Sequence, residues 1–384
     1  MISKLLLLIF PTFILTSHFN GGTVTWGPVN ATATGSPIQI SITQTYSWTA
    51  GLIDCSNAMI VNHSLIDYNT YTSLPGQTLS CTGTCNFGTS GNARGYNNST
   101  PIIPYCTDTN PKMGTVIGQR TDIETLYVND DFTVAFTPTG SQAWIGLQGA
   151  SASAKWSIST EIDLHLRPDG YYNSAPMATM MSPINIPLNQ LQVINIPVSD
   201  NNDNDILKCR IAVGSTECGD TCPPGSLPAN AVVYPNCTIT MTGTTNNYYY
   251  AVAIMVEDYY DNSSTTPMSA TPVQFLVHVV SASSCLTGPV VIGVPAELSC
   301  TPAQVGVPVV TQIVAINYCP SNTNITEIST LSIPGMGKVQ LRQHHHLAQH
   351  QQILPLQVQR ARRVLHRLQH RRALPRPLQR HQGE

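Results

Sequence analysis

The chain has 384 residues, of which 42% are hydrophobic and only 10% are charged. This share of charge is far below the roughly 25% of an average soluble protein, which excludes a coiled coil or an ion-paired helical bundle over most of the chain. The 28 Pro and 26 Gly residues suit short strands and turns. Residues 1–337 hold eight basic and twenty acidic residues, a net charge of −12. This balance argues against nucleic acid as a partner, because phosphate binding needs clustered Lys and Arg.

The N-terminus has the pattern of a secretory signal peptide. Lys4 precedes a mostly apolar stretch at residues 5–15. Such a stretch is long enough for a signal-peptide core of about 7–15 residues, whereas a membrane-spanning helix needs about 20. We therefore expect residues 1–20 to be a signal peptide that is cleaved between Ser17 and Gly22, with a buried first strand as the alternative. The chain is expected to be secreted and to have no membrane span.

The eleven cysteines fall into three groups, which is typical of a protein that forms disulfides in an oxidising compartment. Two groups have four members and can pair internally, although four cysteines allow three pairings. The third group is odd, as expected of a domain that lacks its last cysteine. Each group of four contains a C-x3-C pair, whose spacing also suits zinc, but no histidine lies at ligand spacing nearby. The disulfide candidates are Cys55, Cys81, Cys85, Cys106, Cys209, Cys218, Cys222 and Cys237, and the odd group is Cys285, Cys300 and Cys319.

The two C-x3-C pairs also suggest an internal repeat. The first begins at Cys81 and the second at Cys218, 137 residues later. Two homologous domains with a partial third would explain this spacing. Chance is the alternative, because sequence identity around the pairs is slight.

Seven N-x-[ST] sequons agree with the secretory prediction. Two of them overlap, so we expect one glycan at that place. Each site that carries a glycan must lie on the surface, because a bulky sugar cannot enter a core. The glycosylation candidates are Asn30, Asn62, Asn97, Asn98, Asn236, Asn262 and Asn324.

In the first part of the chain, apolar and polar residues alternate with period two, which predicts strands with one buried face. The alternation is clear at residues 37–43 and 132–137. Residues 69–112 between them are rich in Gly, Asn, Thr and Cys, and we predict a long disulfide-pinned loop or short edge strands there. Trp144 and Trp156 are candidates for the core.

The pattern is clearest after residue 166. Strands are predicted within residues 184–199 and at 206–211, followed by a pair at 250–258 and 273–279. Prolines at strand edges and the lack of helical periodicity indicate a two-sheet sandwich. We therefore predict an all-β fold of tandem disulfide-bonded β-sandwich domains, with boundaries at 21–165 (a β-rich domain with a Cys-rich loop), 166–282 (a sandwich) and 283–337 (a partial third β domain).

Two stretches resemble a known class of domain. The run from Ile196 to Arg210 (IPVSDNNDNDILKCR) and the run from Tyr250 to Asp258 (YAVAIMVED) resemble the cadherin-like and immunoglobulin-like repeats of modular extracellular proteins. They look most like domains of large animal cell-surface proteins that also carry EGF-like or integrin-beta-like repeats. The resemblance covers about residues 168–282 and implies an adhesion or matrix role. No EGF-like cysteine array is present in this chain.

Five oxygen-bearing side chains lie within six residues after one of these strands. Calcium takes six to eight oxygen ligands, and an alternating Asp/Asn loop can supply several. The resemblance implies the same use, because cadherin-like repeats have a D-x-D-x-D-like loop here. Two alternate positions are Asn, so weak affinity is expected, and a solvated Asx-rich turn is the alternative. The candidate calcium ligands are Asp200, Asn202, Asn204 and Asp205, with Asp203 between them.

No catalytic motif is present. The chain lacks a G-x-S-x-G elbow, an H-E-x-x-H helix, a phosphate-binding glycine loop and a dinucleotide fingerprint. His63, His165 and His278 are isolated in the sequence. We therefore predict no catalytic or cofactor-binding residues, and calcium is the one cofactor considered.

The predicted function is a non-catalytic extracellular structural or adhesion module. We interpret the chain as a truncated piece of a larger cell-surface protein. Its expected partner is an extracellular protein or glycan. The alternative is a secreted lectin-like module that binds ligands with Tyr248–Tyr250, Tyr259 and Tyr260. Such tyrosines more often cover a sheet face.

Residues 338–384 break the composition of the chain. They hold ten basic residues and one acid, a net charge of +9, and from Gln340 onward they contain ten Gln, nine Arg and seven His. These residue types, with Leu and Pro, all have codons that begin with C, so we interpret the tail as read in a shifted frame. The alternative is a genuine basic tail that attracts heparin-like polyanions. In both cases we predict a disordered tail.

Overall fold

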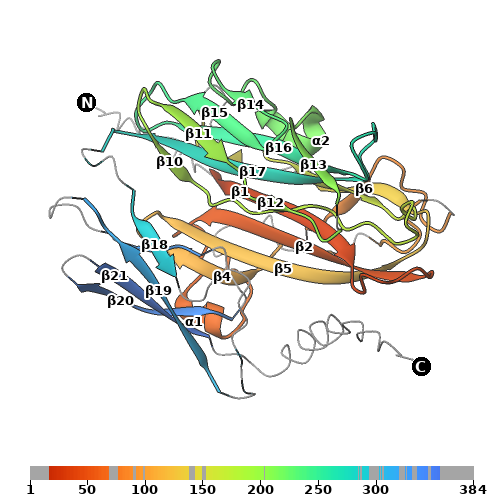
Figure 1. Cartoon of the computed structure of the whole chain (residues 1–384), viewed down its shortest axis with the longest axis horizontal. Coiled ribbons are helices and arrows are strands. Elements are labelled where there is room, and N and C mark those ends of the chain that lie inside the picture. The colour runs from red at the N-terminus through yellow and green to blue at the C-terminus, as the bar shows by residue number, and fades with distance from the viewer. Residues whose placement is uncertain are drawn as a thin grey trace, which may run out of the picture.

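The fold is almost entirely β, as the sequence predicts (Figure 1). The helices of the described residues are α1 (Asn57–Val61), α2 (Gly214–Cys218) and one 3-10 turn, Gly219–Thr221. The computed structural model describes residues 17–354 except 69–76, 90–91, 98–99, 138–142, 149–152, 203, 284, 286–287, 294–301, 303, 305–306, 320–324, 326, 331–334 and 345–346.

The largest sheet has twelve strands, drawn from both halves of the chain. Eight of them follow the order β3-β6-β8-β17-β1-β2-β5-β4, and four others pair beside this path. The eight are β1 (Ser17–Pro28), β2 (Ile38–Thr49), β3 (Ser80–Thr82), β4 (Tyr105–Asn110), β5 (Thr115–Leu126), β6 (Asp131–Phe136), β8 (Ile158–Asp163) and β17 (Ser269–Val280), and the four are β7 (Ala143–Trp144), β10 (Ile184–Pro187), β13 (Ile206–Ile211) and β16 (Tyr249–Tyr259).

The predicted boundary between residues 165 and 166 does not separate two independent sheets. We call residues 17–165 the first region and residues 166–280 the second region. Strand β17 of the second region pairs with β1, where Gly21 lies opposite Phe275, and with β8. Strands β1 and β17 approach each other so closely at Gly21 that a Cβ atom on this residue would lie 2.2 Å from the backbone oxygen of Gln274. The two regions therefore share one sheet.

Each region nevertheless has its own core, and β16 and β17 lie between the two. Leu276 and Ala251 belong to the core of the first region, whereas Phe275 and Val252 belong to that of the second. Strands that are buried on both faces need apolar residues at consecutive positions rather than alternate ones. This explains why β16 is apolar almost throughout and has nine consecutive buried residues.

The first core is aromatic and the second is mostly aliphatic. Phe19 stacks on Trp156 with ring centroids 3.9 Å apart, and Trp48 and Trp144 meet Phe19 edge to face. Trp144 and Trp156 are fully buried, as predicted. Phe19 is therefore at the centre of this aromatic cluster.

A second layer covers β16 and β17 in the second region. Ile194, Ile239 and Met241 of this layer pack into the aliphatic core. The layer is a three-stranded sheet in the order β11-β15-β14, made of β11 (Leu191–Asn195), β14 (Val232–Val233) and β15 (Thr238–Thr242), and nearby β9 (Met177–Ala178) pairs with β12 (Val198–Ser199). The second region is thus a two-layer sandwich, as its period-two pattern predicts.

The C-terminal strands correct the prediction of a disordered tail for residues 338–354. A four-stranded sheet in the order β18-β19-β21-β20 contains β18 (Val290–Gly293), β19 (Val309–Ile316), β20 (Gly337–His344) and β21 (Leu347–Leu354). Residues 339–354 carry a single charge, at Arg342, so like-charge repulsion does not prevent pairing there. The other arginines of the tail lie in residues 355–384, which are outside the described residues.

Candidate functional site

Both groups of four cysteines pair internally, as predicted, and in the same nested order. The outer two cysteines form one disulfide in each group, Cys55–Cys106 and Cys209–Cys237. The inner two close the C-x3-C pairs, Cys81–Cys85 and Cys218–Cys222, so these thiols do not bind zinc. The shared order is what a duplicated domain would give. In the third group Cys285 pairs with Cys319, and Cys300 lies outside the described residues.

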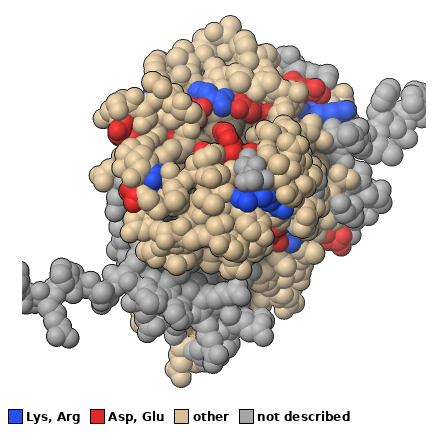
Figure 2. Space-filling model, turned by 90° about the vertical axis from the view of Figure 1, so that its right-hand side faces the viewer, with Lys and Arg blue, Asp and Glu red and all other residues tan. Residues whose placement is uncertain are grey.

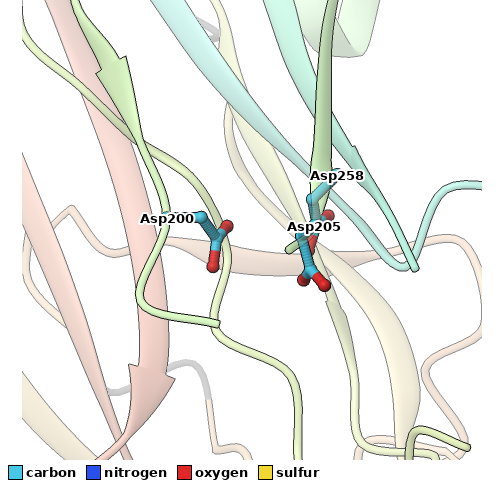
Figure 3. Close-up of side chains that lie close together, drawn as sticks. All are labelled: Asp200, Asp205 and Asp258. Carbon is cyan, nitrogen blue, oxygen red and sulfur yellow. The ribbon is translucent and has the colours of Figure 1, made fainter. Parts of the chain in front are cut away.

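Two of the predicted calcium ligands meet a third acid that the sequence analysis missed. Asp200 follows β12, Asp205 precedes β13, and Asp258 lies in β16. One carboxylate oxygen from each falls within 4.8 Å of the others (Figure 3). The register explains the meeting, because Ile206 of β13 lies opposite Tyr259 of β16. We call Asp200, Asp205 and Asp258 the acidic cluster.

The two predicted asparagine ligands shape the loop. The Asn202 backbone N–H donates to the Asp200 carboxylate at 2.7 Å, which is the Asx turn considered as the alternative. The Asn202 side-chain oxygen accepts from the Ser174 N–H at 2.8 Å. Asn204 is exposed and has a φ of 72°, a left-handed conformation that Asn tolerates. Asp203 lies outside the described residues.

One arginine, Arg167, forms an ion pair with the acidic cluster. Arg167 forms a two-pronged ion pair with Asp205, and the exposed fractions of the two side chains are 3% and 1%. Arg167 also donates to the Asn173 side-chain oxygen at 2.9 Å. Asn173 in turn donates to Asp258 at 2.6 Å, and the Ser269 hydroxyl donates to the other Asp258 oxygen at 2.6 Å. These contacts fix the positions of Asp205 and Asp258.

Asp200 is the member of the cluster whose charge is least compensated. Its Oδ2 atom is buried and has no hydrogen-bond partner among the described residues. Burial raises the pKa of Asp200 to about 7, with a further increase from the negative charges of Asp258 and Asp205. Burial also raises the pKa of Asp258 to about 6, against the hydrogen bonds from Ser269 and Asn173. Asp169 also pairs with Arg167 at 3.2 Å, so four carboxylates meet one guanidinium and leave three negative charges when all are ionised.

This donor set fits a hard divalent cation. The available atoms are carboxylate oxygens, which calcium prefers, and one calcium ion would offset two of the excess negative charges. Among the described residues, the acidic cluster is the one group of three His, Cys, Asp or Glu side chains close enough to hold a metal. Figure 2 shows acidic and basic side chains intermixed around a hollow on one face.

The tyrosines of the lectin-like alternative do not form one surface. Tyr250 is buried, and Tyr249 stacks on His278 at 4.2 Å near the start of β16. Tyr259, at the other end of the strand, lies against the Lys208 ammonium at 4.0 Å. A strand rises about 3.3 Å per residue, so the two groups are roughly 30 Å apart.

The three histidines lie in separate places. His63 follows α1 and meets the ring of Tyr105, and His278 in β17 contacts the side-chain amides of Asn185 and Asn247. His165 follows β8 and pairs with Asp163 at 2.6 Å on the exposed surface.

The described sequons are all exposed. Five of the seven predicted asparagines can be placed, and Asn98 and Asn324 lie outside the described residues. The exposed five are Asn30, Asn62, Asn97, Asn236 and Asn262.

Comparison with known proteins adds little. No family model matches the chain, and no curated protein matches it. Extracellular domains 3–5 of Drosophila OTK are similar at 8% identity and a TM-score of 0.17, over 69% of this chain and 87% of that one. A likeness this weak carries no argument about fold or function. The resemblance to cadherin-like and immunoglobulin-like repeats therefore stays a prediction.

Two structural findings concern the cellular location of the protein. The five disulfides fit an extracellular or secreted protein, because disulfides persist in oxidising environments. No helix among the described residues is long and apolar enough to cross a membrane.

Proposed function

We propose that the protein is an extracellular structural or adhesion module without catalytic activity, and that its acidic cluster binds one calcium ion. The observation that carries the proposal is the charge imbalance of the cluster, where three neighbouring carboxylates share one arginine. The buried, unpartnered Oδ2 atom of Asp200 supports it, because such an atom is costly without a proton or a cation.

Calcium at this place would join parts of the chain that are far apart in sequence. Asp200 belongs to the loop after β12, whereas Asp258 belongs to β16, which lies between the two cores. A cation bound by both would hold the loop against the sheet shared by the two regions. With a dissociation constant of about 0.1–1 mM, typical of extracellular modules, calcium at about 1 mM would stabilise the fold by on the order of 1 kcal/mol.

The adhesive role rests on the same rigid frame. One sheet runs through both regions, and disulfides close loops in each of them. Such a frame holds exposed loops in fixed positions, so that they form a binding surface for an extracellular protein or glycan. Binding of this kind needs no reacting group.

Cell attachment tests the proposal. The full chain, secreted from animal cells, is coated on a plate, and attached cells are counted in calcium and in a calcium chelator. We expect attachment above an albumin coat that falls in the chelator, and a similar fall for Asp200→Asn in calcium. The matched control is Asp67→Asn, which removes an exposed acid outside the cluster.

Each outcome bears on one part of the proposal. Attachment no better than albumin would contradict adhesion. Attachment that neither the chelator nor Asp200→Asn reduces would contradict the role of calcium. A glycan array probed with the same protein should stay dark, whereas binding to defined sugars would favour the lectin-like alternative.

A further inference from the structure

The outer face of the three-stranded sheet β11-β15-β14 is apolar and exposed. Four large apolar side chains lie on β11, β14 and the residue that follows the β14 pair. Their exposed fractions are 67% for Leu191, 61% for Val193, 45% for Val232 and 43% for Tyr234. An exposed apolar face of this kind usually marks a contact site.

The strand register shows that these side chains form one surface. Val193 of β11 and Val232 of β14 both lie opposite Thr240 of β15, and Leu191 lies opposite Thr242. The alternate residues face the other way into the core, as Ile194 and Ile239 do. We call the surface of Leu191, Val193, Val232 and Tyr234, with the β15 threonines between them, the outer patch.

A sequon lies at the edge of the outer patch. Asn236 is in the tight turn that joins β14 to β15, where the Cys237 N–H donates to the Tyr234 carbonyl at 3.0 Å. Cys237 points inward to its disulfide with Cys209, and Asn236 beside it is exposed. The side-chain oxygen of Asn236 accepts from the Thr238 N–H at 3.3 Å, which holds the amide against the start of β15.

We propose that Asn236 carries an N-linked glycan that folds back over the outer patch and covers it. The proposal rests on the secretory part of the proposed function and is independent of calcium. In the modification, the Asn236 amide nitrogen bonds to the anomeric carbon of a lipid-linked oligosaccharide, the amide loses a proton, and the lipid diphosphate leaves. The consensus Asn236-Cys-Thr238 is intact.

The chemistry of the patch suits a sugar. The C–H faces of hexose rings pack on Tyr and Val side chains, and the hydroxyls can bond to Thr240, Thr242 and Asn195 between them. From Thr238 to Thr242 the strand extends only about 13 Å, within reach of the first sugars of a glycan. A covalent tether at the rim also gives the sugar a high local concentration, so weak contacts are enough.

The test removes the glycan and measures exposure of the patch. The full chain is secreted from animal cells, and peptide mass spectrometry measures glycan occupancy at Asn236. Wild type and Asn236→Gln are then compared by fluorescence of an apolar dye and by size-exclusion chromatography with light scattering. The matched control is Asn30→Gln, because the Asn30 oxygen accepts from the Thr32 N–H at 3.2 Å in the same geometry.

We expect occupancy at Asn236, and in Asn236→Gln a dye signal at least about twofold above wild type with self-association that grows with concentration. Asn30→Gln should behave as wild type. Adding Leu191→Thr and Val193→Thr to Asn236→Gln should return the dye signal to the wild-type level. If Asn236→Gln is not secreted, enzymatic release of glycans from the folded wild type gives the same comparison.

Three results would overturn the proposal. They are an unoccupied Asn236 in the secreted chain, an unchanged dye signal after glycan loss, and a glycosylated wild type that already dimerises through the patch. The last would assign the patch to a second copy. None of them affects the attachment test with Asp200→Asn.

Discussion

The two regions of the molecule bury acidic side chains in different ways. In the first region each buried acid pairs directly with a basic side chain, since Asp130 pairs with Arg94 at 2.8 Å and Asp108 pairs with Lys338 at 2.7 Å. In the second region the three acids of the acidic cluster share Arg167. Where a buried acid has only a structural role, a basic side chain in direct contact can neutralise its charge. This difference is the reason why we propose the acidic cluster as a cation site.

The largest expected difference between the regions comes from removing their arginines. Arg167→Met leaves the three carboxylates of the acidic cluster without a cation, which should cost about 3–5 kcal/mol of unfolding free energy. Arg94→Met should cost only about 1–2 kcal/mol, because Asp130 also accepts from the Tyr127 N–H and its partner is partly exposed. Urea denaturation in chelator measures both. Equal costs would remove the distinction between the regions.

The disulfides give the next largest effect. In the chain-entropy view, replacing both cysteines of Cys55–Cys106 by Ala should cost about 4 kcal/mol, and the same change at Cys209–Cys237 about 3.5 kcal/mol. The order follows from the sequence separations of 51 and 28. Loss of Cys81–Cys85, with a separation of 4, should cost about 2 kcal/mol. A reversed order in denaturant midpoints would contradict the entropic ranking.

The acidic cluster should also make the stability of the fold depend on pH. Asp200 has a pKa near 7 in the folded state, above that of an unfolded Asp, so the folded state binds more protons between pH 4 and 7. In chelator, the free energy of unfolding should therefore fall as the pH rises through this range.

The variant Asp200→Asn isolates this contribution from other acids with a raised pKa, such as Glu161 and Asp131. It should flatten the pH profile and be more stable than wild type in chelator at pH 8. Calcium should stabilise wild type more at pH 8 than at pH 5, because protons compete for the same oxygens. Identical profiles for the two proteins would show that Asp200 keeps its ordinary pKa.

Features that depend on local patterns could be predicted from the sequence. Several strands of the second region follow from period-two alternation, and β10, for example, occupies residues 184–187 as expected. The pairing of cysteines within groups follows from even counts in an oxidising compartment. The loop after β12 can be identified from the sequence, because its oxygen-bearing residues are neighbours in the chain.

Features that depend on pairing between residues far apart in the sequence could not be predicted from it. Strand β17 pairs with β1, so that Val273 lies opposite Thr23. The local sequence of neither strand indicates this pairing. Asp258 joins the cluster only through the register of β13 and β16. One signal was available for Asp258, because an acid at the end of a long apolar run is expected to be buried and paired. The composition of the whole tail does not indicate its strands, because most of its arginines follow residue 354.

Calorimetric titration of the calcium-free full chain with calcium at pH 7.5 tests the central claim most directly. The account predicts one calcium ion per chain with a dissociation constant of about 0.1–1 mM, and no binding by Asp200→Asn. It also predicts unchanged binding by Asp67→Asn. No heat of binding by wild type, or equal binding by wild type and Asp200→Asn, would contradict the assignment of the acidic cluster as a calcium site.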